Sequence, residues 1–354
     1  MTWFTEPTLK HALWSSLESR GYKTGAEVWL TPSERIDILF ADGAGQYVGI
    51  EVKDLDSLWG LGRREKIRGQ VSRYLKSGTL DGLYLAAVSS GWGEAEFGSI
   101  LRQFPMVGEI CVPQNDVLAP DFDFWRYIRN LPTPLVRSST PTIRSGPEDE
   151  LKHRLWKWYR ASGERVMLEG TLPNTSNTGS ALVRIDMAVF RGTDPQGKPV
   201  IYAEEVLENS DSTELVGVEV KASISSGSEL SRQLEAYLAG GCLTSMYLAV
   251  RDVDVGVATS ILSRTFLDRS NPVNAVGIIA IPSQPSTEPR VIKTARRLEI
   301  RHDGILINRR GLNGKVTKEV LHPVWGYPVL HDEKVRPKNP VEVWEDSIVY
   351  RAMR

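Results

Sequence analysis

The sequence predicts a mixed α/β protein made of two tandem copies of one domain, followed by a small β-rich C-terminal extension. A strand-like run occurs twice, as Val48–Lys53 and Val216–Lys221, and each copy contains the same Glu-x-Lys pair. A helical run also occurs twice, as Leu9–Trp14 and Leu151–Trp156, with five of six positions identical. Because both runs recur in the same order, we interpret them as an internal duplication.

The first copy is expected to begin with an αβββαβ series of elements. Leu9, Leu13 and Leu17 recur at helical spacing, and Gly21 follows the last turn of that helix. Alternating apolar residues bounded by turn residues indicate the strands. The expected elements are helix 6–19, strands 27–30, 35–40 and 48–53, helix 63–76, strand 83–88, helix 94–103 and strand 107–112.

The second copy repeats this order, with a longer polar insertion at Gly192–Thr213 between its two central strands. Its expected elements are helix 148–161, strands 165–169, 183–190 and 215–221, helix 229–239, strand 245–250, helix 257–267 and strand 275–281.

These elements predict domains at residues 1–130 and 147–282, joined by a linker at 131–146 that is rich in Pro, Ser and Thr. Residues 283–354 are expected to form the C-terminal extension. From Arg290 onward the extension carries 14 Lys or Arg against 8 Asp or Glu, so it is basic. Strands are expected in it at 298–301 and 305–308.

Composition restricts the class of protein. The 354 residues exceed one average domain, and 41% hydrophobic with 25% charged residues is typical of a globular chain. We expect a cytoplasmic protein, since neither a signal peptide nor a membrane-span-length apolar run is visible. Two cysteines exclude a cysteine-ligated zinc or iron–sulfur site. The net charge of −1 does not indicate a nucleic-acid binder, although charge can be segregated locally.

Polar residues at matching places in the two copies suggest a catalytic site. Asp37 and Glu51 lie on strands expected to pair as a hairpin, so their carboxylates can converge. Two carboxylates suit Mg²⁺, which also keeps waters and phosphate oxygens as ligands. Lys53 shares a strand face with Glu51 and can stabilise charge on phosphorus. The second copy has the same set in Asp186, Glu219 and Lys221.

A helix after each Glu-x-Lys strand carries a Gln and a Tyr four residues apart, hence on one helix face. These pairs are Gln70 with Tyr74 and Gln233 with Tyr237. An amide and a phenol there can hold the lysine, a water or the scissile strand, although the tyrosines fit half-buried core positions equally well.

This set of residues resembles the PD-(D/E)XK nuclease superfamily, whose core is a restriction-endonuclease-like αβββαβ unit with a metal site at its central hairpin. The Gln-x-x-x-Tyr pair is similar to the RecB-type branch. Glu6 and Glu148, near the starts of the opening helices, are similar to the additional acidic residue of archaeal Holliday-junction resolvases. The sequence departs from the pattern in that no Pro precedes either Asp.

The resemblance implies a Mg²⁺- or Mn²⁺-dependent deoxyribonuclease with two sites in one chain, acting in DNA repair, restriction or defence. Asp37, Glu51, Asp186 and Glu219 would hold the metal. DNA is the implied partner, no membrane is implied, and further partner proteins or a homo-oligomer stay open. Basic side chains beside the first site are expected to contact DNA phosphates. They are Arg63, Arg64, Lys66 and Arg68.

Simpler interpretations stand beside these. The Glu-x-Lys pairs could be the solvated face of a strand, and the basic run a solvated helix. Glu6 and Glu148 fit the helix dipole, His11 and His153 fit a helix surface, and Trp156 with its neighbours fits helix packing. No phosphate-binding P-loop or zinc-protease motif is present. The rival functions are a non-catalytic DNA-binding or assembly module of the same fold and a ribonuclease; endo- and exonuclease modes remain open.

Overall fold

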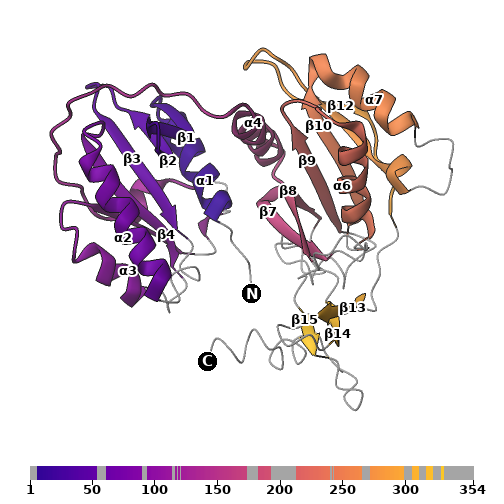
Figure 1. Ribbon diagram of the computed structural model, residues 1–354. Coiled ribbons are helices and arrows are strands. Elements are labelled where there is room, and N and C mark those ends of the chain that lie inside the picture. The colour runs from indigo at the N-terminus through magenta and orange to yellow at the C-terminus, as the bar shows by residue number, and fades with distance from the viewer. Residues whose placement is uncertain are drawn as a thin grey trace. The chain divides into compact units, whose positions relative to one another are not determined.

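The computed structural model forms two compact units, Met1–Met167 and Leu168–Arg354 (Figure 1). The structure describes residues 6–53, 61–89, 94–113, 116–117, 119, 121–173, 182–192, 213–239, 241, 243–264 and 272–298, together with the strands at 305–310, 316–321 and 328–330. None of the described helices is long and apolar enough to cross a membrane.

The first unit is built on a six-stranded sheet in the order β1-β2-β3-β4-β5-β6. The first three strands run antiparallel, β3, β4 and β5 run parallel, and β6 returns antiparallel. Its elements are α1 (Glu6–Ser19), β1 (Lys23–Thr31), β2 (Glu34–Ala41), β3 (Tyr47–Lys53), α2 (Leu61–Lys76), β4 (Gly82–Ser89), α3 (Glu94–Leu101), β5 (Gly108–Pro113) and β6 (Ile128–Asn130).

The second sheet has the corresponding strand order, β7-β8-β9-β10-β11-β12, and the corresponding directions wherever both are described. Its elements are β7 (Arg165–Pro173), β8 (Leu182–Arg191), β9 (Glu214–Lys221), α6 (Gly227–Ala239), β10 (Ser245–Arg251), α7 (Val255–Arg264), β11 (Gly277–Ile281) and β12 (Arg290–Lys293). The helix expected to open the second copy is α4 (Pro147–Ala161). Two six-stranded mixed sheets with corresponding strand orders confirm a mixed α/β protein and are compatible with the expected tandem arrangement.

Two edge strands were not expected from the sequence. β6 and β12 are short and mostly exposed, so they lack the apolar alternation that marks a strand. β12 pairs with β11 and therefore belongs to the second sheet, although its residues fell within the expected C-terminal extension. The rest of the extension contains the three-stranded sheet β13-β14-β15 (Ile305–Arg310, Val316–Leu321, Pro328–Leu330). The strand expected at 298–301 lies almost wholly outside the described residues.

Helices cover both faces of the first sheet (Figure 1). The leucines of α1 that predicted the helix, Leu9, Leu13 and Leu17, are fully buried. On the other face, Ile67 and Val71 of α2 and Phe97 of α3 form one apolar core with residues of β1, β2 and β4. The sheet is therefore buried on both sides, and β3 at its centre is apolar apart from Glu51 and Lys53.

The glycine in each repeated strand has a packing reason. A Cβ atom at Gly217 would lie 2.6 Å from Ile185 Cδ1, and a Cβ atom at Gly49 would be crowded by Ile36 in the same way. Each isoleucine belongs to the neighbouring strand, and its Cδ1 methyl occupies the space that a Cβ atom would need. The glycine in the Val-Gly-x-Glu-Val-Lys pattern thus makes room for a close side-chain contact just before the Glu-x-Lys pair.

His11 and His153 are buried, so the expectation that they lie on a helix surface is wrong. α4 packs beside α1 within the first unit, and the His153 ring stacks on Trp14 with centroids 3.8 Å apart. The centroids of His11 and His153 are 5.4 Å apart. Burial, together with the nearby His153 and Lys10, holds the pKa of His11 well below its ordinary value. Trp156 and Tyr159 are buried, which confirms their expected packing role.

We expect the His11→Phe variant to be less sensitive to acid than the unmodified chain. The depressed pKa keeps folded His11 neutral, whereas the unfolded chain binds a proton below a pH of about 6.5. Stability is thus fully present above that pH and falls as the pH decreases, by up to about 1.4 kcal/mol per pH unit. Unfolding temperatures measured at about pH 7.5, 6.5 and 5.5 test this, since titrations common to both chains cancel. Parallel curves for the two proteins would contradict it.

Candidate functional site

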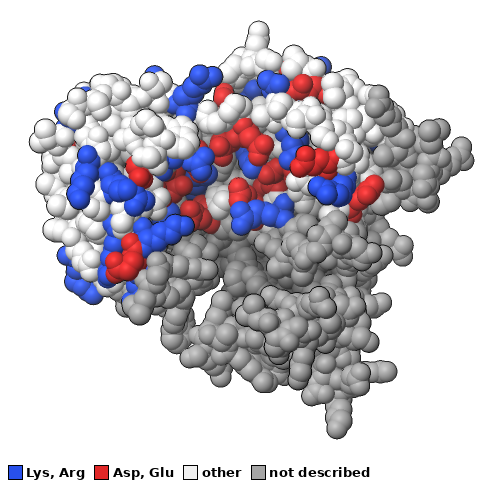
Figure 2. All heavy atoms as spheres, in the orientation of Figure 1, with Lys and Arg blue, Asp and Glu red and all other residues white. Residues whose placement is uncertain are grey.

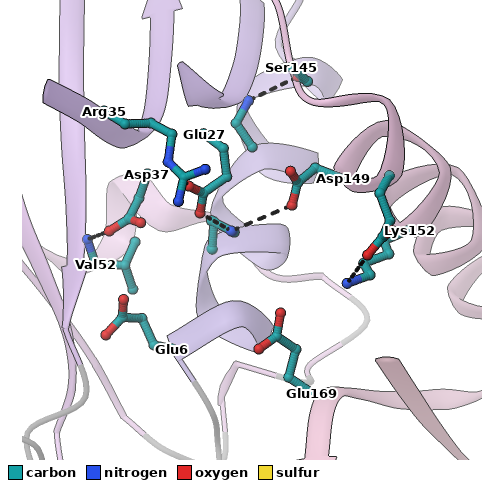
Figure 3. Close-up of polar contacts among 12 residues, drawn as sticks. Glu6, Glu27, Arg35, Asp37, Val52, Ser145, Asp149, Lys152 and Glu169 are labelled. Carbon is teal, nitrogen blue, oxygen red and sulfur yellow. Dashed lines mark hydrogen bonds and ion pairs between the residues drawn. The ribbon is translucent and has the colours of Figure 1, made fainter. Parts of the chain in front are cut away.

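Asp37 and Glu51 come together where two strands separate. β2 and β3 pair from Ala41 opposite Tyr47 to Ile38 opposite Ile50, and no pairing is recorded beyond that point. There the Asp37 carboxylate takes over the role of a backbone acceptor, because Val52 N–H donates a hydrogen bond of 2.7 Å to Asp37 Oδ2 (Figure 3). The strand end therefore positions Asp37 beside the Glu-x-Lys pair.

Lys53 lies among three carboxylates. Its Nζ contacts Glu51 Oε1 and lies 3.8 Å from Asp37 Oδ2 and 3.6 Å from Glu6 Oε1. The side chain of Lys53 is only 11% exposed and that of Glu51 only 2%, so a solvated strand face is excluded here. Burial by itself would lower the pKa of Lys53, but Glu51, Asp37 and Glu6 outweigh burial and raise that pKa. Glu6, at the start of α1, thus joins the site.

Tyr74 links the site to the core. Its ring is buried, which confirms a core position, and its hydroxyl also reaches the site. Gln70 Nε2 donates to Tyr74 Oη at 2.6 Å, and Tyr74 Oη donates to the Arg35 carbonyl at 2.6 Å. Tyr74 Oη also lies 3.0 Å from Glu51 Oε2. Burial and Glu51 raise the pKa of Tyr74, so the phenol keeps its proton.

The surroundings favour a proton on Glu51 when no cation is bound. The single phenol proton of Tyr74 cannot fully serve both the Arg35 carbonyl and Glu51. Burial and the neighbouring Asp37 raise the pKa of Glu51 well above its ordinary value, against the opposing effect of Lys53. A divalent cation would relieve the repulsion between the Glu51 and Asp37 carboxylates, as the proton does.

The second unit contains the same arrangement. Val220 N–H donates to Asp186 Oδ2 at 2.8 Å, and Lys221 Nζ donates to Glu219 Oε1 at 2.5 Å. Burial and Asp186 raise the pKa of Glu219 to about 7. The Gln–Tyr pair on the following helix lies as in the first unit. Gln233 Nε2 donates a hydrogen bond of 2.7 Å to Tyr237 Oη and another to Glu219. Tyr237 Oη lies 2.8 Å from a backbone carbonyl of β8, that of Arg184, and 2.9 Å from Glu219 Oε2.

The two copies differ around this shared set. Glu148 lies on α4, where its carboxylate is 3.1 Å from Lys152 Nζ one helical turn away. That contact is the kind expected of a carboxylate in a first helical turn. The site in the second unit adjoins a cavity of about 500 Å³. Its lining residues are Arg184, Lys221, Glu229, Arg232, Gln233, Ala236 and Tyr237.

The basic residues of α2 have different surroundings. Lys66 is exposed, Arg68 Nη1 lies 2.6 Å from Glu65, and Arg64 is half-buried. The side chain of Arg63 is outside the described residues. Acidic and basic side chains are interspersed on the described surface in view, without a broad field of one sign (Figure 2). DNA contact by these four residues therefore stays a prediction.

A further pair of matching residues was missed in the sequence. Glu27 on β1 and Glu169 on β7 each bind the arginine two residues before the site aspartate, Arg35 and Arg184 respectively. Glu27 also binds the buried Lys10 at 2.6 Å (Figure 3). The Arg-Ile-Asp triplet occurs in both copies of the sequence, and Lys10 lies in the repeated helical run. Nothing in the local sequence connects these residues with Glu27.

Comparison with known proteins leaves family and function open. No family model and no curated protein matches the chain. One solved structure that it resembles is a protein of unknown function from Silicibacter pomeroyi, with 13% identity and a TM-score of 0.26. The match covers 44% of this chain and 76% of that one. A likeness at this level carries no argument about fold or chemistry.

The donor set fits a hydrated divalent cation. Within the described residues, no group of three or more His, Cys, Asp or Glu side chains forms a metal cage. Mg²⁺ does not need one, because it commonly binds one or two carboxylates and keeps waters or phosphate oxygens. Asp37 with Glu51, and Asp186 with Glu219, supply such pairs. Glu51 and Glu219 are buried and have raised pKa values, whereas Asp37 and Asp186 are half-buried. Perturbed pKa values of this kind are common at functional sites.

Proposed function

We propose that this chain is a metal-dependent nuclease that hydrolyses phosphodiester bonds of DNA at two sites. One observation carries the proposal: the same arrangement of side chains occurs in both units, on corresponding strands and a corresponding helix. In each copy an aspartate accepts a hydrogen bond from the backbone N–H between a buried Glu and Lys, and a Gln–Tyr pair holds the Glu. This supports the resemblance to the PD-(D/E)XK superfamily and its restriction-endonuclease-like core.

Each residue has a role in this mechanism. Asp37 and Glu51 would hold Mg²⁺ or Mn²⁺, which supplies Lewis-acid polarisation of the phosphate and a more acidic water. Lys53 is kept charged by its carboxylate neighbours, so it can orient the attacking water and stabilise negative charge developing on phosphorus. Gln70 and Tyr74 fix the Glu51 carboxylate. Their counterparts in the second unit are Asp186, Glu219, Lys221, Gln233 and Tyr237.

Energetics favour a catalytic role over a purely structural one. Burying a charged pair costs several kcal/mol per ion, and an apolar pair of similar volume is often at least as stable. A scaffold that only needed the fold would gain nothing from keeping a buried glutamate beside a lysine on the central strand of both sheets. Chemistry at both positions explains why the charges are retained.

We expect the purified chain to cleave DNA in Mg²⁺ or Mn²⁺ and not in the presence of a chelator. Closed circular, linear, single-stranded and branched DNA should be compared, with single-stranded RNA in parallel. Cleavage of closed circles would establish an endonuclease, and degradation of linear ends alone an exonuclease. DNA binding without cleavage of any substrate would contradict the proposal and favour the assembly module, whereas cleavage of RNA alone would favour the ribonuclease.

A further inference from the structure

Two glutamates have an unusual backbone conformation. Among the described residues, Glu27 and Glu169 are the only non-glycine residues with positive φ, at 54° and 52°. An L-residue pays a steric cost in this left-handed region, and such strain persists where the surrounding structure requires it. The two glutamates occupy corresponding strands of the two sheets, β1 and β7, so the strain is part of the duplicated design.

Each strained glutamate holds an arginine next to the candidate site. Arg35 Nε lies 2.7 Å from Glu27 Oε2, and Arg184 Nη1 lies 2.9 Å from Glu169 Oε2. The arginines are also fixed through their backbone, because their carbonyls accept the hydroxyls of Tyr74 and Tyr237. The tyrosine that contacts the site Glu therefore also fixes the position of the arginine.

These ion pairs are poorly placed to stabilise the fold. The side chains of Arg35 and Arg184 are 51% and 71% exposed, and exposed ion pairs contribute little stability. Glu27 is nonetheless anchored from behind, since its other oxygen binds the buried Lys10 at 2.6 Å. The buried contact behind Glu27, its strained backbone and the exposed guanidinium together indicate that the arginine is held in position to bind a ligand.

In the second unit, the arginine lies beside a cavity that a ligand could occupy. Arg184 lines the cavity of about 500 Å³ together with Lys221, Gln233 and Tyr237 of the site and with Arg232. Three cationic side chains and one acidic side chain, Glu229, therefore surround it. A guanidinium presents N–H groups in a planar fork that matches the oxygens of a phosphate, and the bond to Glu169 occupies one end of it.

We propose that Arg184 binds a backbone phosphate of the nucleic acid next to the bond that is cut, and that Glu169 positions it. Arg35 and Glu27 do the same in the first unit. This inference rests on the proposed nuclease function, because it assigns the neighbouring phosphate of the same substrate. The arginine contacts substrate, whereas the glutamate acts through the arginine.

Arg184→Gln tests the contact, because the exposed side chain can be replaced without loss of folding. Binding of a short DNA duplex in Ca²⁺, without turnover, should be measured by fluorescence anisotropy at several salt concentrations. We expect the Kd to rise about tenfold or more. The slope of log K against log salt should fall by about one, as for one lost phosphate contact. Glu169→Gln keeps the charge of Arg184, so we expect weaker binding with a nearly unchanged slope.

A matched control lies on the same strand. Arg191 is at the other end of β8, paired with Glu214 at 3.5 Å, and is not part of the cavity lining. Arg191→Gln removes the same charge and should leave Kd and slope unchanged. If Arg184→Gln behaves like Arg191→Gln, the inference is wrong.

Failure of the inference and failure of the nuclease function give different results. Loss of cleavage in Asp37→Asn/Asp186→Asn, combined with unchanged binding in Arg184→Gln, overturns the phosphate contact alone. Unchanged cleavage in Asp37→Asn/Asp186→Asn, combined with a reduced salt slope in Arg184→Gln, overturns the catalytic assignment and supports the phosphate contact.

Discussion

The double variant Lys53→Ala/Lys221→Ala is expected to bind DNA but not to cut it. Each lysine contacts the buried glutamate of its site, and in the proposed mechanism its preorganised charge acts where negative charge develops on phosphorus. Removal of one such group typically lowers the rate by about 10²–10³. If each site cuts one strand, either single variant should nick duplex DNA. Cleavage of supercoiled plasmid, with nicked and linear products quantified separately, measures this.

Stability must be followed in the same variants. Lys53 is more buried than Lys221, with side chains 11% and 25% exposed, and it has three carboxylate neighbours. Lys53→Ala therefore costs more stability than Lys221→Ala, and Lys53→Met, which keeps the volume, is the better companion variant. Lys157→Ala, at an exposed lysine on α4, is a control that should keep full activity. Full cleavage by the folded double variant would remove the nuclease assignment from these residues.

Much of the fold and of the site could be predicted because the information is local and occurs twice. The leucines of α1 and the alternation in β3 each specify an element within a few residues, and the bounds agree closely with the structure. The Asp, the Glu-x-Lys and the Gln–Tyr pair follow from strand and helix periodicity, which fixes the faces they occupy.

What was missed depends on contacts between distant segments. His11 has a polar side chain on a helix, and the packing of α4 against α1 places it beside the buried His153. Glu27 is itself neither glycine nor asparagine, so its residue type does not indicate a positive φ. β12 is an exposed edge strand with no apolar alternation. In each case the tertiary partner, and not the local pattern, determines the structure.

The buried charges and the strained glutamates suggest a common cause. The fold tolerates a repelling carboxylate pair at Asp37 and Glu51, and it tolerates left-handed backbone at Glu27. Both are unfavourable in the isolated protein, and the proposed cation and phosphate would offset that cost. Strain and buried charge therefore gather at one end of each sheet, as expected for sites preorganised for charged ligands.

Mg²⁺ or Mn²⁺ is expected to stabilise the unmodified chain and to have much less effect on Asp37→Asn/Asp186→Asn. A ligand that binds only the folded state stabilises by about 2.7 kcal/mol at a concentration of 100 times its Kd. Asparagine retains an oxygen that can accept the Val52 N–H, so the variant keeps its local structure and loses only charge. Unfolding temperatures with and without metal, together with calorimetric titration, provide a readout that does not depend on cleavage.

Asp81 offers a matched control at the other end of β3. Its Oδ2 accepts a hydrogen bond of 2.7 Å from Tyr47 N–H, as Asp37 does from Val52, but Asp81 pairs with Arg137 and is not near a second carboxylate of the site. Asp81→Asn removes one negative charge from the same sheet and should keep the full response to metal. An equal metal-induced rise in the unmodified chain and in Asp37→Asn/Asp186→Asn would show that the cation binds elsewhere. A response lost only in the site variant would place the metal at the aspartates on which the proposed mechanism depends.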